Sequence, residues 1–230
     1  MAIVCAIVLA VALAGCAACI QSGSGNQTTP GVTSTPLPAI GSTINLTSKI
    51  DLTNVHWYKY QILPSGTPAD LGYGVTTTGS TLTERWDFNV NYDGMMADEV
   101  TGTGNYSDNV YTANTISFLD HANHTKVLSG NLTVLKNGMF FYHGDLTPKI
   151  LELEHLLDLT NSSYSGYNTV TYGGTETVTV PQGTYTAIKY MYNSTNNLTI
   201  YTDSDVPVPI KLVAVTPLGT IYDIELIGWG

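Results

Sequence analysis

Short runs of β-branched and aromatic residues, separated by Gly, Asn and Asp, fill the chain beyond residue 49. The alternation is clearest at residues 81–92, where Leu82, Trp86, Phe88 and Val90 share one face of an extended strand and Glu84 is the polar exception. Runs of this kind between turn-forming residues are typical of β-strands. Strands are predicted at residues 55–63, 81–92, 110–119, 126–135, 139–143, 176–180, 185–192, 198–202, 210–215 and 220–227.

Two dipeptides mark tight hairpins, Asp93-Gly94 and Asn137-Gly138. Both central residues of a type I′ turn need positive φ, which Asn, Asp and Gly tolerate best. Most other connections are also short, and short connections join antiparallel neighbours. The predicted fold class is therefore mainly β, an antiparallel curved sheet of about ten strands that forms a half-barrel.

One segment has helical rather than strand periodicity. Thr147 suits the N-cap and Pro148 the first helical position, and Leu153, Leu156 and Leu157 follow at helical spacing. A lone amphipathic helix beside a sheet buries its apolar stripe against one face of that sheet. We expect a helix at residues 148–159 that packs on the sheet through these leucines.

The first twenty residues are apolar and uncharged. Residues 3–13 suit the hydrophobic region of a signal peptide, and Leu13-Ala14-Gly15-Cys16 resembles the lipobox of prokaryotic lipoproteins. That resemblance implies a signal peptide at residues 1–15 and a lipid on the sulfur of Cys16, whose acyl chains anchor the protein to the membrane. Two alternatives remain: an uncleaved membrane anchor, since twenty apolar residues just reach spanning length, and plain secretion.

Residues 16–48 carry no charge and consist mostly of Ser, Thr, Gly and Pro after the first few positions. Such a segment cannot bury enough apolar surface to fold, so it is interpreted as a disordered tether between the lipid and the domain. The remaining residues, 49–230, have the size of a single β-rich domain with its own core. The expected location is extracytoplasmic, on the cell membrane.

The charge and the cysteines narrow the possible partners and chemistry. The net charge is −10, and an acidic surface disfavours nucleic acid as a partner. The three cysteines, Cys5, Cys16 and Cys19, all precede the domain, so the domain has no disulfide, cysteine nucleophile or cysteine metal ligand. The sequence thus indicates a domain that relies on its apolar core.

The C-terminal quarter resembles a known group of proteins. TETVTVPQGTYTAIKY, VPVPIKLVAV and GTIYDIELIGWG, within residues 174–230, look like the C-terminal part of β-rich lipoproteins of methanogenic archaea, in which a V-P-x-G-T-[FY] turn joins two strands. The lipobox, the long sheet and the mid-chain helix together resemble the lipoprotein-carrier (Lol-type) half-barrel group. The resemblance implies a lipid-carrier architecture and transfers no functional residue.

The candidate catalytic and metal-binding residues all have simpler interpretations. His121 and His124 have a spacing that could hold zinc on a helix, but here it lies in a predicted solvated hairpin turn. Asp203-Ser204-Asp205 begins like a calcium loop, yet no ligand Glu follows at the required distance. Glu152, Glu154 and His155 fall on the polar face of the predicted helix. With no hydrolase motif present, we expect no enzyme activity, no cofactor and no bound metal.

Two classes of ligand fit a displayed β-domain, and a third hypothesis is an enzyme. The leading hypothesis is a non-enzymatic envelope protein that binds or carries an apolar, lipid-like ligand in the half-barrel. The alternative is a glycan-binding or adhesion module that uses exposed aromatic residues, among them Trp57, Trp86 and Trp229, although core packing is the simpler role for these rings. An enzyme would need converging carboxylates, which a single sequence cannot reveal.

N-x-[ST] sequons are unusually frequent for a chain of this size. Eight of the 16 Asn residues begin one, which makes glycosylation a hypothesis. The alternative is that Asn in turns and Thr in the adjoining strands create sequons incidentally. The candidate sites are Asn26, Asn45, Asn105, Asn123, Asn131, Asn161, Asn193 and Asn197.

Overall fold

The computed structural model describes residues 37–46, 50–69, 75–145, 170–193 and 197–230. Within these ranges the chain forms one antiparallel sheet of twelve strands. The predicted signal peptide, Cys16, most of the predicted tether and the predicted helix at residues 148–159 lie outside the described residues. The strands are β1 (Thr43–Ile44), β2 (Trp57–Gly66), β3 (Thr81–Tyr92), β4 (Met95–Tyr106), β5 (Tyr111–Asp120), β6 (Asn123–Lys136), β7 (Met139–Asp145), β8 (Val170–Val180), β9 (Gly183–Asn193), β10 (Asn197–Asp203), β11 (Val206–Val215) and β12 (Thr220–Trp229).

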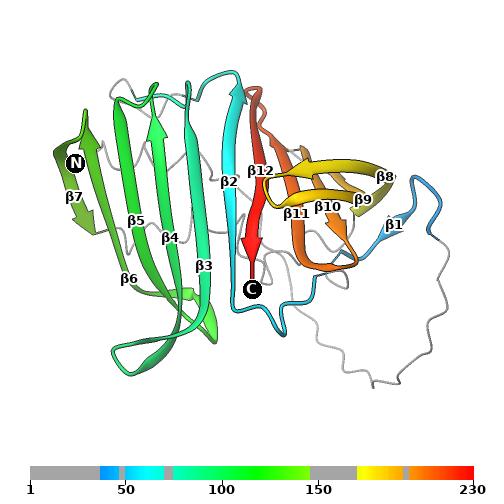
Figure 1. Cartoon of the computed structure of the whole chain (residues 1–230), viewed down its shortest axis with the longest axis horizontal. Coiled ribbons are helices and arrows are strands. Elements are labelled where there is room, and N and C mark those ends of the chain that lie inside the picture. The colour runs from blue at the N-terminus through cyan, green and yellow to red at the C-terminus, as the bar shows by residue number, and fades with distance from the viewer. Residues whose placement is uncertain (1–36, 47–49, 70–74, 146–169, 194–196) are drawn as a thin grey trace.

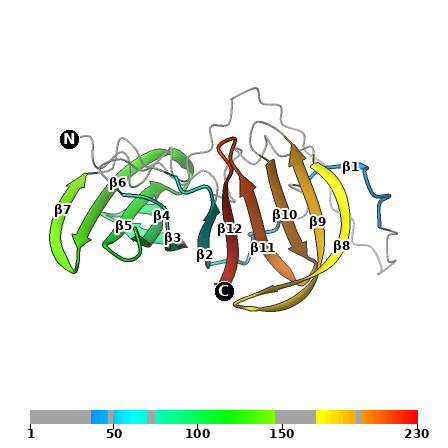
Figure 2. The same ribbon diagram turned by 90° about the horizontal axis from the view of Figure 1, so that it is seen from above.

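The sheet consists of two consecutive meanders joined side by side. Strands β2 to β7 form one meander and β8 to β12 the other, and the last strand, β12, pairs with β2 in the middle of the sheet (Figure 1). In Figure 2 the sheet curls at its edge strand β7 and, toward the other edge, at β8, which lies next to the short edge strand β1. The mainly β, open antiparallel sheet is confirmed, and its curvature is compatible with the predicted half-barrel.

The two hairpin turns predicted from the sequence are both present in the structure. Asp93 and Gly94 adopt φ of 49° and 82°, and Asn137 and Gly138 adopt 51° and 76°, so both pairs have the positive φ that the predicted turns require. The VPQGTY segment joins β8 to β9 through Pro181 and Gln182. Residues that tolerate a left-handed backbone therefore mark where β3 turns into β4 and where β6 turns into β7.

The alternation of apolar residues does not predict one long strand, β4. β4 has Asp98, Gly102 and Gly104 at positions that face the core, so apolar alternation is lost. The glycines are needed because neighbouring side chains fill their space: a Cβ on Gly104 would lie 2.6 Å from the Tyr106 ring. A bulge between Asp87 and Val90 also shifts the pairing of β3 with β4, which breaks the predicted stripe before Val90.

The inner face of the sheet carries an unusually aromatic core. Tyr58, Tyr60 and Trp86 are fully buried there, and the rings of Tyr58 and Trp86 stack with their centroids 6.0 Å apart. The Tyr60 hydroxyl donates a hydrogen bond to the Pro209 carbonyl oxygen at 2.6 Å, so that its polar group is satisfied inside the core. This face also carries Ile224 from β12, which joins the two meanders through one continuous core.

Candidate functional sites

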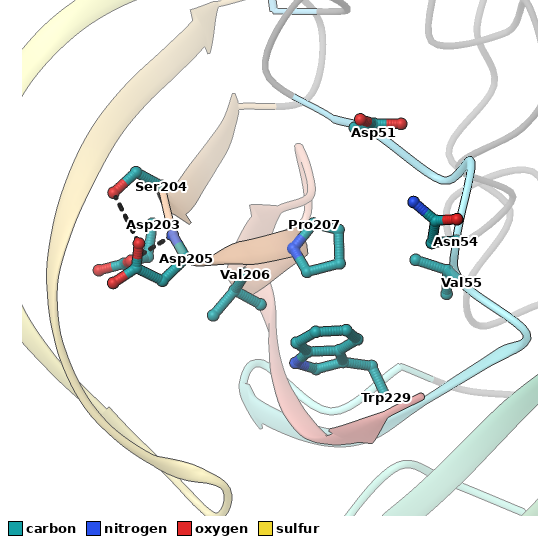
Figure 3. A pocket seen from close by; sticks show the side chains of 9 residues that line it. All are labelled: Asp51, Asn54, Val55, Asp203, Ser204, Asp205, Val206, Pro207 and Trp229. Carbon is teal, nitrogen blue, oxygen red and sulfur yellow. Dashed lines mark hydrogen bonds between the residues drawn. The ribbon is translucent and has the colours of Figure 1, made fainter. Parts of the chain in front are cut away.

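A pocket of about 340 Å³ lies between the segment before β2, the β10–β11 turn and the end of β12 (Figure 3). In Figure 3, Trp229 lies beside Pro207 and Val206, which together form an apolar wall. Carboxylates from two separate segments stand around the opening. The lining residues are Asp51, Asn54, Val55, Asp203, Ser204, Asp205, Val206, Pro207 and Trp229.

Local hydrogen bonds hold the acidic residues of this pocket in place. Asp203 Oδ1 accepts from the Asp205 amide at 2.9 Å, which forms the tight β10–β11 turn. Asp51 Oδ1 accepts from the amide and the hydroxyl of Thr53, and these bonds lower the pKa of Asp51. The Asp51 amide donates to the Pro207 carbonyl oxygen at 3.2 Å, which ties the two walls together. The bonds to Asp51 and Asp203 use only Oδ1 of each carboxylate.

The lining suits a ligand that has both hydroxyl groups and an apolar face. Carboxylate and amide oxygens accept hydrogen bonds, and an indole offers a flat apolar surface. No Lys or Arg is among the described residues that line the pocket. Within the described ranges, no group of three His, Cys, Asp or Glu side chains is arranged to hold a metal ion. Asp203 and Asp205 lie in the β10–β11 turn and line the pocket.

A second constellation lies at the other meander, around Asp98 on β4. This side chain is completely buried and accepts three hydrogen bonds, from the Asn89 amide at 2.9 Å, His121 Nδ1 at 2.8 Å and His124 Nε2 at 2.6 Å. The His124 ring also lies 5.7 Å from the Trp86 ring. Burial opposes the ionisation of Asp98, but the hydrogen bonds from His124, Asn89 and His121 outweigh it and lower its pKa.

This arrangement corrects the prediction of a solvated turn at residues 120–124. His121 and Ala122 do form the exposed tip between β5 and β6, but His124 is buried against Trp86. The partner, Asp98, went unrecognised because its strand lacks apolar alternation. A polar residue at an inward position beside an H-x-x-H spacing is the signal that could have found it.

The outer face, opposite the one with Tyr60, carries a continuous polar row. Each residue of the row lies directly opposite the next on the neighbouring strand. Lys211 Nζ donates to Glu225 Oε1 at 3.0 Å, and Gln61 Nε2 donates to Glu225 Oε2 at 2.9 Å. Such cross-strand pairs stabilise a sheet. The row consists of Lys189, Tyr201, Lys211, Glu225, Gln61, Thr83, Thr103, Asn114, Thr133 and His143.

The three tryptophans have different surroundings. Trp86 is fully buried in the core, where its Nε1–H donates to Glu84 Oε1 at 2.7 Å. Trp57 is half-buried on the outer face, with the Arg85 guanidinium 4.3 Å from its ring centroid. Trp229 alone among them lines the pocket.

The sequons that fall in the described residues differ in accessibility. Asn45, Asn123, Asn131 and Asn197 have exposed side chains, whereas Asn105 is half-buried and its Oδ1 accepts from the Thr112 hydroxyl at 2.9 Å. Asn26 and Asn161 lie outside the described residues, as do Glu152, Glu154 and His155. Asn193 ends β9.

Comparison with known proteins yields broad likenesses of shape. No protein-family model and no curated protein matches the chain. Among solved structures, MucB in complex with MucA(peri) is similar at a TM-score of 0.32 and 12% identity, over 80% of this chain and 52% of that one. The hypothetical protein CT021 from Chlamydia trachomatis is similar at a TM-score of 0.31 and 10% sequence identity. This likeness covers 82% of this chain and 93% of that one. This chain spans about half of the MucB chain. These likenesses assign no function, and neither points to archaeal lipoproteins or to the Lol-type group.

The described residues contain no helix with the length and hydropathy needed to cross a membrane.

Proposed function

We propose that this protein is a non-enzymatic binding protein of the cell envelope, held outside the membrane by a lipid on Cys16, and that its pocket beside Trp229 binds a neutral, hydroxyl-rich glycan. The observation that carries the proposal is the lining of the pocket, where Trp229, Asn54 and three aspartates surround about 340 Å³. Pockets of roughly 300–1,000 Å³ with an apolar wall and a few fixed polar groups are typical of small-molecule sites.

The chemistry of the pocket favours a sugar over a lipid. Sugar hydroxyls can donate to the carboxylate oxygens while a C–H face of the ring packs on the indole of Trp229. A lipid-like ligand would need the inner face instead, where Tyr58, Tyr60 and Tyr222 are already buried at 0–2% exposure. An acyl chain would have to displace this packing, so the apolar-ligand hypothesis becomes the competitor.

The test is binding of the full-length mature protein in detergent to a panel of neutral oligosaccharides, measured by calorimetry. Trp229→Ala should weaken binding at least tenfold because the stacking surface is removed. Asp203→Asn should also weaken binding, because it replaces a carboxylate, which only accepts hydrogen bonds, with an amide that has one acceptor and one donor group. Asp93→Asn is the matched control, since Asp93 lies in the distant β3–β4 turn. The oligosaccharide should be recovered intact. Failure of every glycan to bind, together with a lipid retained in native mass spectra, would establish the competing hypothesis.

A further inference from the structure

Met96 and His121 lie opposite each other at one end of the first meander. Ala97 pairs with Asp120 in the register of β4 and β5. Next to this pair, the His121 amide donates a hydrogen bond to the Met96 carbonyl oxygen at 3.3 Å. Met96 and Asp98 are two positions apart on β4, so their side chains project from the same face of the strand. Because the His121 ring contacts Asp98, the imidazole and the thioether of Met96 share this face.

Asp98 orients the His121 ring. An ionised carboxylate only accepts hydrogen bonds, so the 2.8 Å contact between Asp98 Oδ1 and His121 Nδ1 places the ring proton on Nδ1. The lone pair of the neutral ring is then on Nε2, the nitrogen on the other side of the ring. A histidine whose second nitrogen donates to a carboxylate in this way is the usual form of a metal-binding histidine in proteins.

The imidazole and the thioether are accessible, whereas the carboxylate is not. Met96 is 61% exposed, and the side chain of His121 is 38% exposed. Asp98 is completely buried, and both of its oxygens already accept hydrogen bonds. A metal ion at this place would therefore have one nitrogen and one sulfur as its ligands from the protein.

We propose that Met96 Sδ and His121 Nε2 bind one Cu(I) ion at this end of the first meander, with the imidazole oriented by Asp98. A thioether is a soft ligand that selects Cu(I), whereas Zn²⁺ sites in proteins use three or four nitrogen, oxygen or thiolate ligands. The unbranched side chain of methionine has three rotatable bonds, so its sulfur can move to the ring when the metal binds. The site shares no residue with the glycan pocket and is independent of it.

Cu(I) binding to the full-length mature protein in detergent tests the site. Free thiols are alkylated first, because a thiolate such as that of Cys19 would also bind Cu(I). The protein is then titrated with Cu(I) under ascorbate and without oxygen, against a chromogenic Cu(I) chelator. One equivalent should bind, and X-ray absorption at the copper edge should show nitrogen and sulfur as ligands.

Substitutions of the ligands identify the site. Met96→Leu keeps the size of the side chain but removes the sulfur, so it should weaken Cu(I) binding about tenfold or more and remove sulfur from the absorption spectrum. His121→Gln should abolish binding, and because this ring is at the surface, the variant should fold. Asp98→Asn should weaken binding about 10–100-fold and leave nitrogen and sulfur as the ligands at saturating Cu(I). Met95→Leu is the matched control, because Met95 is 43% exposed on the same hairpin but projects from the opposite face of β4.

The proposal fails if the wild type binds no Cu(I), or if Met96→Leu binds it as tightly as the wild type does. It also fails if Met95→Leu weakens binding as much as Met96→Leu, since the face of the strand would then not matter. Stoichiometric binding of Zn²⁺ that is lost in both His121→Gln and His124→Gln would likewise overturn it, because the two imidazoles would then hold a zinc ion together.

Discussion

Tyr60 places a hydroxyl on the buried inner face of the sheet. Its side chain is completely buried, and burial raises its pKa well above the ordinary value, so the hydroxyl stays protonated and donates to the Pro209 carbonyl oxygen. This bond crosses from β2 to β11, past the intervening β12. The hydrogen bond therefore links two strands that are not direct neighbours in the sheet.

Tyr60→Phe should destabilise the protein by about 1–3 kcal/mol, because the Pro209 carbonyl oxygen loses its donor while buried. The measurement is urea unfolding at neutral pH. Tyr185→Phe serves as the control, since Tyr185 is only half-buried, and it should change stability by less than about 0.5 kcal/mol. Equal effects of the two substitutions would mean that the Tyr60 hydrogen bond contributes nothing.

Asp98 makes stability depend on pH at the acid end. Its folded-state pKa lies below the ordinary value of about 3.8, so the unfolded chain binds a proton at this site more readily than the folded chain does. The stability it contributes is present above the ordinary pKa and is lost as pH falls through the folded pKa. The difference in unfolding free energy between wild type and Asp98→Asn should shrink as pH falls below about 4. A difference that is constant between pH 4 and 2 would contradict this prediction.

Some single-residue features of the structure can be predicted from the sequence, and others cannot. Asn137-Gly138 identifies its turn because the requirement for positive φ acts on those two residues alone. Asp98 and its imidazoles meet only after β4 and β5 pair and a bulge at Asn89 brings an amide to the same carboxylate. A turn that depends on two adjacent residues can be predicted from the sequence. A site whose residues come from different strands cannot, because it depends on the register in which those strands pair.

The pairing of β12 with β2 determines whether the two meanders behave as one unit. Ile62 and Ile224 lie opposite each other in this seam, and both are buried on the inner face. At its end, Gly66 adopts a φ of 71°, and a Cβ there would lie 2.4 Å from the Gly219 carbonyl oxygen. The seam is therefore closely packed at the Ile62–Ile224 pair and at the Gly66 end.

Ile224→Ala should cost about 2–5 kcal/mol, and the whole domain should still unfold in one transition because both meanders share the core at this seam. Denaturant unfolding followed by both Trp fluorescence and circular dichroism tests this. Ile221→Ala is the comparison on the same strand, where the side chain is half-buried on the outer face. Two separated transitions in the wild type would show that the meanders fold independently.

At the level of elements, the prediction succeeded where apolar residues alternate and failed where they do not. Residues 81–92 were predicted with the bounds that β3 has. β4 was missed, and β8 begins at Val170, six residues before the predicted start, with a bulge at Gly174 that interrupts its pattern. Glycine and buried polar residues at inward positions interrupt the alternation of apolar and polar residues on which strand prediction depends. The helix at residues 148–159 stays a prediction.

On the scale of the whole molecule, the lipobox-like LAGC predicts how the sheet is held at the membrane. Cys16→Ser removes the only sulfur at the proposed processing site, so the protein should appear in the soluble fraction or keep its signal peptide. Membrane fractionation and intact-mass measurement in the native cells check this. Cys5→Ser is the control and should leave the protein lipidated. A Cys16→Ser protein that is still processed and membrane-bound would refute the anchor.

The outer surface of the molecule makes the glycosylation hypothesis specific. Asn131 is exposed on the outer face of β6, and Asn123 is exposed at the start of the same strand. Asn105 is different, because it is half-buried and bonded to Thr112, so a transferase would first have to break that contact. If the sequons are used, Asn131 and Asn123 should carry glycans and Asn105 should not.

Intact-mass measurement of protein from its native cells tests this pattern. Asn131→Gln should lower the mass by one glycan, whereas Asn114→Gln should not, although Asn114 is equally exposed on neighbouring β5, because it begins no sequon. Comparing the masses of these two variants distinguishes the loss of a glycan from any other effect of replacing an exposed Asn on this face. A native mass explained by the polypeptide and its lipid alone would remove the glycoprotein hypothesis, and it would also leave the hydroxyl-rich outer face open to ligands rather than covered by the protein's own sugars.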